Sequence, residues 1–512
     1  MLFHTWIFAI FFLLVYPVYL AGRHVRMGWL WRLLTWPIDL KVKLLMRLMS
    51  AVGLRRAAAS ADEAWQWFIR RGYEAFQGTR LSEPWLLLAS YVFYGWWNPL
   101  YLVLIVFSTL IDYFAVVAMA RLGGKKLWLA LSVVNHLLLL GMFKYAGWVT
   151  SSVNALLGAA GVAYSVPAPG VLLPVGISFY TFQAMSYTID YYRGRIPKEP
   201  NLIRFAAFVA LFPQLVAGPI ERAANLLPQL RRALKVSWQD VADGLSMFVV
   251  GLFKKVALAD YLAQYVDKVY DAPAEHAAPA LILATFAFGW QIYFDFSGYT
   301  DMARGIGRMM GFRLMVNFNN PYLATGLGDF WRRWHISLST WFRDYVYIPL
   351  GGNRRGELRT YLNMLATMVI SGLWHGAGWT FLIWGALHAA GRAATRELEK
   401  TSFYRHDVPR IFKQAGVFAF VTFAWIFFRA QDLGDAWLIV TRIVTAGWAD
   451  PRVPLLAIDL VLWVCVYQLL FEWGTRHVLQ LAPVRVGLVA AMILYLAVVP
   501  GPRGEPFIYF QF

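Results

Sequence analysis

Long apolar runs recur along the 512-residue chain, and short clusters of arginine and lysine separate them. A helix of about 20 apolar residues can cross the hydrocarbon layer of a bilayer, because its backbone hydrogen bonds close within the segment. Hydrophobic residues make up 59% of the chain and charged residues 15%, which is more apolar than the core of a soluble domain requires. The sequence therefore predicts an all-α polytopic membrane protein with about 10–12 membrane helices.

The formal net charge of +18 resides in short clusters between the apolar runs. This pattern is typical of cytoplasmic loops that face anionic lipid, and it does not indicate a nucleic-acid groove. The first apolar run, Phe3 to Ala21, is followed by arginines instead of being preceded by them, which is the reverse of a secretory signal. The single cysteine, Cys465, excludes an intramolecular disulfide and a multi-cysteine metal site.

The charge pattern divides the chain into three expected segments. Residues 1–21 form a first transmembrane helix. Residues 22–80 are basic and amphipathic, with tryptophans between the arginines and lysines, and are expected to lie along the cytoplasmic surface as an anchor. Residues 81–512 form the membrane core, and the motifs that indicate a site fall at 294–388.

Two parts of this core depart from simple crossings. A crossing from Leu127 to Trp148 is expected to be followed by an external small-residue loop through Val171. The run from Phe205 to Ala217 is too short to span, and the basic residues after it would lie on the wrong side, so we expect a re-entrant segment beside a cavity. The charged segment 330–359 is expected at the cytoplasmic interface.

His375 stands in an apolar run, between glycines that permit close backbone approach and tryptophans that offer flat walls. An ionisable residue at membrane depth is costly and indicates function by default. A neutral imidazole there could take a proton from an incoming hydroxyl. The alternative is a structural histidine that is hydrogen-bonded between packed helices.

His335 lies in a tryptophan-rich segment that we interpret as one helix. Helical spacing then places Arg332, His335 and Ser339 on one face, away from an apolar stripe that includes Trp334. The alternative is an interfacial aromatic belt with an incidental histidine. We expect these substrate-contacting residues around the two histidines: Trp374, Trp334, Ser339, Asp295 and Arg332.

No metal site is expected, because the sequence has neither an HExxH motif nor a histidine–carboxylate cluster. His388 is interpreted as structural, and Asp301 with Arg304 as an ion pair at a helix end. The glycines from Gly351 to Gly356 predict a tight turn, whose Arg354 and Arg355 could meet the phosphates of a cofactor.

Six stretches of the chain are similar to motifs of the membrane-bound O-acyltransferases, and within them to the bacterial branch that acts in alginate O-acetylation. These stretches are Leu173–Gln183, Phe212–Pro219, Phe294–Asp301, Asp329–Ser339, Ser371–Ala377 and Phe507–Phe512. Together they cover most of the chain from about Leu81 onward. The basic segment before Leu81 is longer than the family pattern.

The resemblance implies a membrane-bound O-acyltransferase that moves acetyl groups from the cytoplasm across the membrane for O-acetylation of an extracytoplasmic polysaccharide, such as alginate or another exopolysaccharide, with His375 as the general base. His375 matches the catalytic histidine of the family and His335 its second motif histidine, in a bundle with re-entrant and interfacial helices around a central funnel. Acetyl-CoA or another acyl thioester would be the donor substrate, with no bound cofactor. The membrane would be the bacterial inner membrane, and a periplasmic acetyltransferase or polysaccharide-modifying protein would be the partner, besides membrane lipids.

Three alternatives remain open from the sequence. The acyl group could be D-alanine from a carrier protein, or a fatty chain transferred to a lipid. The chain could instead be a transporter without chemistry, although no internal repeat is visible to support such a fold.

Overall fold

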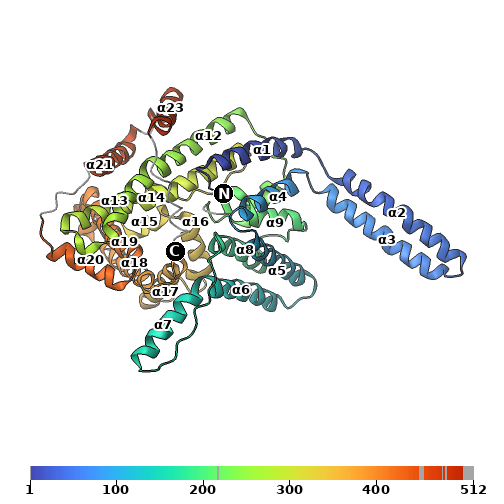
Figure 1. Ribbon diagram of the computed structural model, residues 1–512, viewed down its shortest axis with the longest axis horizontal. Coiled ribbons are helices and arrows are strands. Elements are labelled where there is room, and N and C mark those ends of the chain that lie inside the picture. The colour runs from blue at the N-terminus through green and yellow to red at the C-terminus, as the bar shows by residue number, and fades with distance from the viewer. Residues whose placement is uncertain (1, 216–217, 449–454, 476, 479–480, 500–512) are drawn as a thin grey trace.

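The computed structural model describes residues 2–215, 218–448, 455–475, 477–478 and 481–499 (Figure 1). Every named element in these ranges is a helix or a helical turn, and the extended pairing between Arg26 and Arg80 is an isolated bridge. The all-α polytopic architecture that the apolar runs predicted is confirmed.

The elements of the first half are α1 (Trp6–Gly22), α2 (Gly28–Ala51), α3 (Arg55–Gln77), α4 (Ser82–Gly95), η1 (Pro99–Tyr101), α5 (Leu102–Arg121), α6 (Lys125–Leu140), η2 (Gly141–Tyr145), α7 (Ala146–Ala159), α8 (Ile177–Tyr192), α9 (Leu202–Ala210), α10 (Phe212–Leu215) and α11 (Ala223–Leu230). The elements of the second half are α12 (Trp238–Phe253), η3 (Lys254–Ala259), α13 (Asp260–Tyr270), η4 (Pro273–Glu275), α14 (Ala278–Met309), η5 (Pro321–Leu323), α15 (Leu327–Arg333), α16 (Ile336–Phe342), η6 (Arg343–Tyr347), α17 (Glu357–His375), α18 (Trp379–Leu398), η7 (Phe403–Asp407), α19 (Arg410–Arg429), α20 (Leu433–Thr445), α21 (Leu455–Leu470), η8 (Phe471–Thr475) and α23 (Ala482–Val498).

Four helical segments of the described chain are long and apolar enough to cross a membrane: Pro99–Arg121, Lys125–Ala159, Ala278–Met309 and Arg410–Arg429. Four shorter apolar helices accompany them: Trp6–Gly22, Leu202–Leu215, Val461–Leu470 and Ala482–Val498. Several of the apolar runs are thus shorter than a full span. The total of 10–12 crossings stays a prediction.

The 32-residue helix α14 forms the centre of the molecule, and nearly its whole length is buried. Helix α12 lies beside it through two glycine pairs, Gly244 with Gly305 and Gly251 with Gly298 (Figure 1). A Cβ at Gly251 would stand 2.5 Å from the Gly298 carbonyl oxygen, so only glycine permits this approach. Each pair is one heptad from the next, which keeps the two helices in contact along their length.

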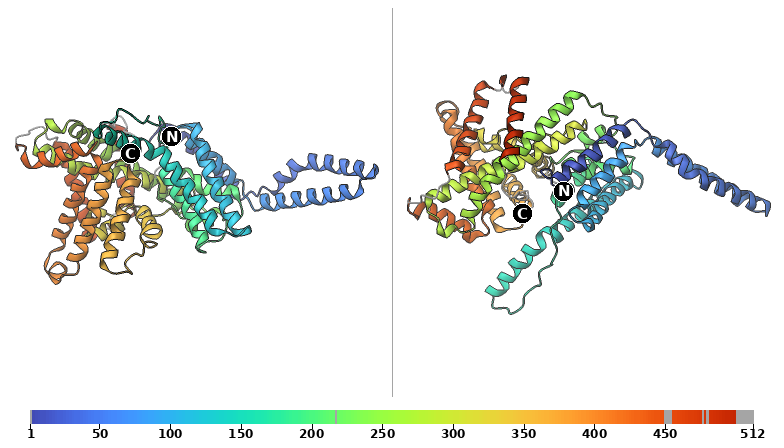
Figure 2. Two further views of the ribbon diagram at one scale, coloured as in Figure 1. Left: turned by 90° about the horizontal axis from the view of Figure 1, so that it is seen from below. Right: turned by 45° about the horizontal axis from the view of Figure 1, so that its top comes forward.

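The crossing expected from Leu127 to Trp148 is longer than predicted. The helix continues through the π-helical turn η2 into α7 and ends at Ala159, so the first part of the expected external loop is helical. Alanine and serine favour or tolerate a helix, and the first proline comes only at Pro167, so small residues were a poor loop signal here. Helix α7 projects from the body (Figures 1 and 2).

The short run that was expected not to cross is a buried pair of helices. Helix α9 ends where Leu211 takes a ψ of 111°, and α10 follows with Pro213 near its start. The Gln183 side chain donates to the Phe208 carbonyl at 2.5 Å, which pairs a backbone group freed by the break. The end of the expected run, residues 216–217, lies outside the described residues.

Helices α2 and α3 form an antiparallel hairpin that projects away from the helical body (Figures 1 and 2). Inside the hairpin, the Trp65 indole donates to Asp39 at 2.9 Å and the Trp31 indole to the Ile69 carbonyl at 2.9 Å. Large apolar side chains of α2, such as Trp29 and Trp36, are exposed. The hairpin therefore presents an apolar face that no other described element covers.

Candidate active site

His375 is the last residue of α17, which forms a close hairpin with α18. The backbones approach at Gly372 and Gly385, where a Cβ would collide with carbonyl oxygens of the opposite helix. The imidazole is buried and packs edge-on against the rings of Trp384 and Phe428, with centroids 5.1 and 5.4 Å away. The fold thus places His375 at the C-terminal end of a helix, inside the bundle.

The expectation of one continuous helix through His335 is wrong. Helix α15 ends at Arg333 and α16 begins at Ile336, and His335 between them has a left-handed φ of 41°. The break arises because Asn317 forms three hydrogen bonds to the first residues of α16. The Asn317 backbone carbonyl accepts from the Ile336 N–H, and its side-chain oxygen accepts from the Ser337 N–H and from the Ser337 hydroxyl. These bonds are tertiary, so helical spacing could not reveal them.

The break turns His335 away from Arg332 and into the protein. Its imidazole is fully buried, against the rings of Phe296 at 4.6 Å and Phe179 at 6.3 Å between centroids. The centroid of His375 lies 6.5 Å from that of His335, and Trp374 contacts both rings. Burial lowers the pKa of His335 to about 3, so this imidazole is neutral at physiological pH.

A cavity of about 420 Å³ reaches residues near the pair, although neither histidine is in its lining, and we call it the arginine pocket. Four arginines line it: Arg332, Arg343, Arg392 and Arg396. Ile336, which follows His335, and Ser371, which lies one helical turn before His375, also line it. The pocket therefore joins a basic surface to the helix positions next to both histidines.

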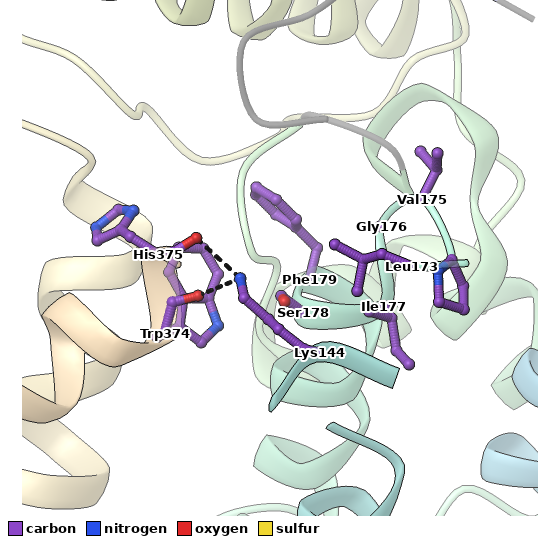
Figure 3. A pocket seen from close by; sticks show the side chains of 10 residues that line it. Lys144, Leu173, Val175, Gly176, Ile177, Ser178, Phe179, Trp374 and His375 are labelled. Atoms are coloured by element: carbon purple, nitrogen blue, oxygen red, sulfur yellow. Dashed lines mark hydrogen bonds between the residues drawn. The ribbon is translucent and has the colours of Figure 1, made fainter. Parts of the chain in front are cut away.

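A small pocket of about 30 Å³ lies at the C-terminal end of α17, and we call it the lysine pocket (Figure 3). Its lining comprises Lys144, residues 173–179, Trp374 and His375. Figure 3 shows that the His375 ring points away from Lys144 whereas its carbonyl oxygen points toward it. Phe179 and Trp374 line this pocket and also contact His335, so their rings lie between the pocket and His335, whereas His375 belongs to the pocket lining.

The turn η2 caps the end of α17. The Lys144 ammonium donates to the Trp374 carbonyl at 2.6 Å and to the His375 carbonyl at 2.9 Å, and the Tyr145 hydroxyl donates to the Leu373 carbonyl at 3.0 Å (Figure 3). The last carbonyls of a helix have no partner within it, and a cation there also complements the helix dipole. No carboxylate of the described chain lies within ion-pair distance of Lys144.

The structure brings some of the predicted site residues together and leaves others apart. Trp374 packs against both histidines, and Ser339 and Arg332 line the arginine pocket. Trp334 is instead buried among Tyr322, Phe330 and Trp425.

Three predicted residues lie away from both pockets. Asp295 forms a buried ion pair with Lys255 at 2.9 Å. Arg354 and Arg355 are exposed on the glycine turn and do not line the arginine pocket. The turn itself is as predicted, with positive φ at Gly351, Gly352 and Gly356. His388, interpreted as structural, is buried among aromatic rings.

Sequence reasoning missed Lys144 and three of the four arginines. Lys144 is the one charged residue between Leu127 and Trp148, and that isolation was a usable signal. Arg392 and Arg396 are four residues apart, which places them on one face of α18. Among the described residues, no group of three or more histidine, cysteine, aspartate or glutamate side chains could hold a metal ion.

Comparison with known proteins places this geometry in a family context. Residues 193–431 match the model of the membrane-bound O-acyltransferase family. The chain is 44% identical over 366 residues to the probable alginate O-acetylase AlgI of Azotobacter vinelandii, which is 71% of this chain and 72% of that protein. It is 39% identical over 473 residues to the probable alginate O-acetylase AlgI of Pseudomonas putida, covering 86% and 96%. It is 36% identical over 408 residues to a peptidoglycan O-acetyltransferase of Helicobacter pylori, covering 74% and 76%.

Proposed function

The chain belongs to the membrane-bound O-acyltransferase family and is an O-acyltransferase, and from this premise we propose that it moves acetyl groups from acetyl-CoA to an extracytoplasmic acceptor. The observation that carries the proposal is the buried histidine pair: residues near both histidines line the arginine pocket, and His375 itself lines the lysine pocket. The proposed acceptor is a polysaccharide, because the similar proteins are named for alginate and peptidoglycan O-acetylation, and the proposed partner is a periplasmic protein that passes the acetyl group to it.

The arginine pocket is the proposed donor site. Guanidinium groups bind phosphate through paired N–H donors, and CoA carries phosphates far from its thioester. Arg392 and Arg396 at the mouth would hold these phosphates, while the pantetheine arm extends between Met364 and Met368 toward Ser371. On the topology expected from the basic clusters, this mouth faces the cytoplasm of a bacterial inner membrane.

The proposed reaction needs one general base and one carbonyl-polarising group. The neutral His375 imidazole takes the proton of the acceptor hydroxyl, and the resulting oxygen attacks the thioester carbonyl carbon. The neutral His335 imidazole donates a hydrogen bond to the oxygen of the tetrahedral intermediate. When the C–S bond breaks, the CoA thiolate receives the proton from His375, so the histidine returns to its neutral state.

Transfer of labelled acetyl groups to glycan by the purified protein with its periplasmic partner tests the proposal. We expect His375→Ala to lower the rate by about 100- to 10,000-fold, the usual contribution of a general base. His335→Ala should lower it by about 100-fold, the cost of losing one donor to an oxyanion.

The matched control is His388→Phe, which changes another buried histidine outside both pockets. It should retain most of the activity of a folded protein. Undiminished transfer by a folded His375→Ala variant contradicts the assignment of the base. Transfer of D-alanyl or fatty acyl groups, with no acetyl transfer, contradicts the assignment of the donor.

A further inference from the structure

A third cavity, of about 860 Å³, lies between the α12–α14 pair and the C-terminal helices α21 and α23. It shares no lining residue with the arginine or lysine pocket, so the proposed reaction does not use it. We call it the C-terminal cavity. Its lining is charged toward one end and mainly apolar toward the other, and this gradient indicates the kind of ligand that the cavity binds.

Charged side chains gather at one end. Asp243 lies between Arg308 at 2.7 Å and Arg485 at 2.8 Å, and it joins α12, α14 and α23 at this level. In the same lining, Asp301 pairs with Lys254 at 2.7 Å and with Arg304 at 3.7 Å. Two carboxylates of the lining thus face four cations, and Asp240, which is outside the lining, also approaches Arg308 at 3.6 Å.

The cations are consequently in excess inside the cavity. Their side chains are partly buried, with Arg304 25% and Arg308 30% exposed. The Nε atoms of these two arginines are buried and have no hydrogen-bond partner among the described residues. A partly buried surplus of positive charge with unused donors favours a ligand that brings negative charge and acceptor oxygens.

The other end of the cavity is mainly apolar. Farther along α12 and its continuation the apolar lining residues are Val250, Phe253 and Leu258, and the Phe253 ring contacts Tyr495 of α23 at 5.4 Å. Lys254 lies between Phe253 and Leu258 in the chain, and its ammonium is paired with Asp301 of α14. The helical rise from Asp243 to Leu258 corresponds to about 22 Å, enough for an extended acyl chain. Trp463 and Met492 extend this apolar wall from α21 and α23.

The direction of this gradient agrees with the expected topology. The charged end is formed by the start of α12, the end of α14 and the start of α23. On the positive-inside rule all three lie at the cytoplasmic side. Basic pockets between membrane helices on that side are typical headgroup sites for anionic lipids.

We propose that the C-terminal cavity binds one anionic glycerophospholipid from the cytoplasmic leaflet. The phosphodiester accepts hydrogen bonds from Arg304, Arg308 and Arg485, and an acyl chain lies along Val250 and Phe253. The lipid then fastens α21 and α23, which are shorter than a full span, to the α12–α14 pair. This inference stands independently of the acyl-transfer proposal.

Native mass spectrometry of the full-length protein measures the binding directly. The protein is delipidated in detergent and exposed to equal amounts of dioleoylphosphatidylglycerol and dioleoylphosphatidylcholine. We expect one retained phosphatidylglycerol, preferred at least tenfold. The double variant Arg304→Gln, Arg485→Gln should lose this preference at least fivefold, and Met492→Trp, which fills the apolar end and keeps every charge, should lower occupancy of both lipids.

Arg232→Gln is the matched control, because Arg232 is an exposed arginine that does not line the cavity. It should retain the wild-type preference. Equal retention of both lipids by the wild type overturns the proposal, as does an unchanged preference in the double variant. Displacement of the lipid by millimolar glycerol phosphate overturns the lipid assignment and leaves a site for a soluble anion.

Discussion

His335 shows how one residue position combines strain with burial. A non-glycine residue in the left-handed region costs on the order of 1–3 kcal/mol, and this cost persists only where surrounding bonds impose it. Asn317 imposes it here through three hydrogen bonds to residues 336 and 337. Apolar surroundings at His375 and tryptophan-rich surroundings at His335 indicated both histidines as site candidates, but the break beside His335 could not be predicted, because its cause lies 18 residues away in the chain.

Asn317→Leu tests this restraint. The leucine removes the side-chain acceptor of Ser337, so we expect a loss of about 1–3 kcal/mol in stability and a fall of at least about tenfold in acetyl transfer, because His335 is misplaced. The melting temperature and initial rates are the measurements. Asn319→Ala is the control, because the exposed Asn319 contributes its backbone N–H to Arg333 and keeps it after substitution. A normal rate in a folded Asn317→Leu variant would refute the positioning role.

Glu221 makes stability depend on pH. It is fully buried and accepts from the Met315 N–H at 2.5 Å and from Asn225 at 2.7 Å, and burial raises its pKa to about 7. A carboxyl whose folded pKa exceeds its unfolded value binds more protons when folded, so stability falls as pH rises from about 4.5 to 7. We expect this loss to be on the order of 2–3 kcal/mol.

Melting temperatures between pH 5 and 8 in one detergent provide the test. The wild type should lose stability across this interval relative to Glu221→Gln, which cannot ionise. Parallel curves for the two proteins would show that Glu221 does not titrate in this range.

At the scale of elements, apolar runs located most helices, but local contacts decided where they end. The break at Asn98-Pro99 is a local signal, and the structure places a short turn there between α4 and α5. Helix α20 follows a capping aspartate, Asp432, and was missed because its run is short. The glycine contacts of α12 and α14 join residues far apart in sequence, so they could not be paired from one chain.

Hydrogen bonds from Lys144 and Tyr145 of η2 cap the C-terminal end of α17, and they join two helical segments that are distant in sequence. Lys144→Met keeps the length and apolar stem of the side chain but removes both hydrogen bonds to the end of α17. We expect kcat to fall at least about tenfold through the altered orientation of His375. The KM for acetyl-CoA should change by less than about twofold, because Lys144 does not line the arginine pocket.

Two further variants separate positioning from general structure. Lys144→Arg can still donate to both carbonyls and should recover part of kcat. Tyr145→Phe removes only the bond to Leu373 and should have a smaller effect. Equal losses of kcat and of folded protein in all three variants would mean that the cap only stabilises the fold.

At the scale of the whole molecule, the α2–α3 hairpin is an appendage with paired ends. The Met27 N–H donates to the Thr79 carbonyl at 3.1 Å and the Leu81 N–H to the Val25 carbonyl at 2.8 Å, so the chain leaves and re-enters the body at one point. The amphipathic character of residues 22–80 was readable from the sequence. Its shape as a projecting hairpin was not, because a single amphipathic helix would show the same pattern.

Replacement of residues 28–77 by a short glycine linker tests whether the hairpin is separable. We expect the shortened protein to fold and to retain acetyl transfer within about twofold in detergent, because the paired ends already lie close together. Loss of the folded state would show that the hairpin belongs to the core. A peptide of the hairpin should float with anionic vesicles through its exposed tryptophans. The same peptide with Trp29 and Trp36 changed to serine should float less.

The rings of Phe179 and Trp374, which lie between the lysine pocket and His335, bear on how a cell keeps its proton gradient. An enzyme that passes an acyl group through a bilayer opens the bilayer to protons if its substrate channels ever connect. In the proposed reaction the group that passes these buried aromatic rings is an acetyl group, which is small and uncharged. On that proposal, acetylation of an extracytoplasmic acceptor would not discharge the proton gradient that drives ATP synthesis.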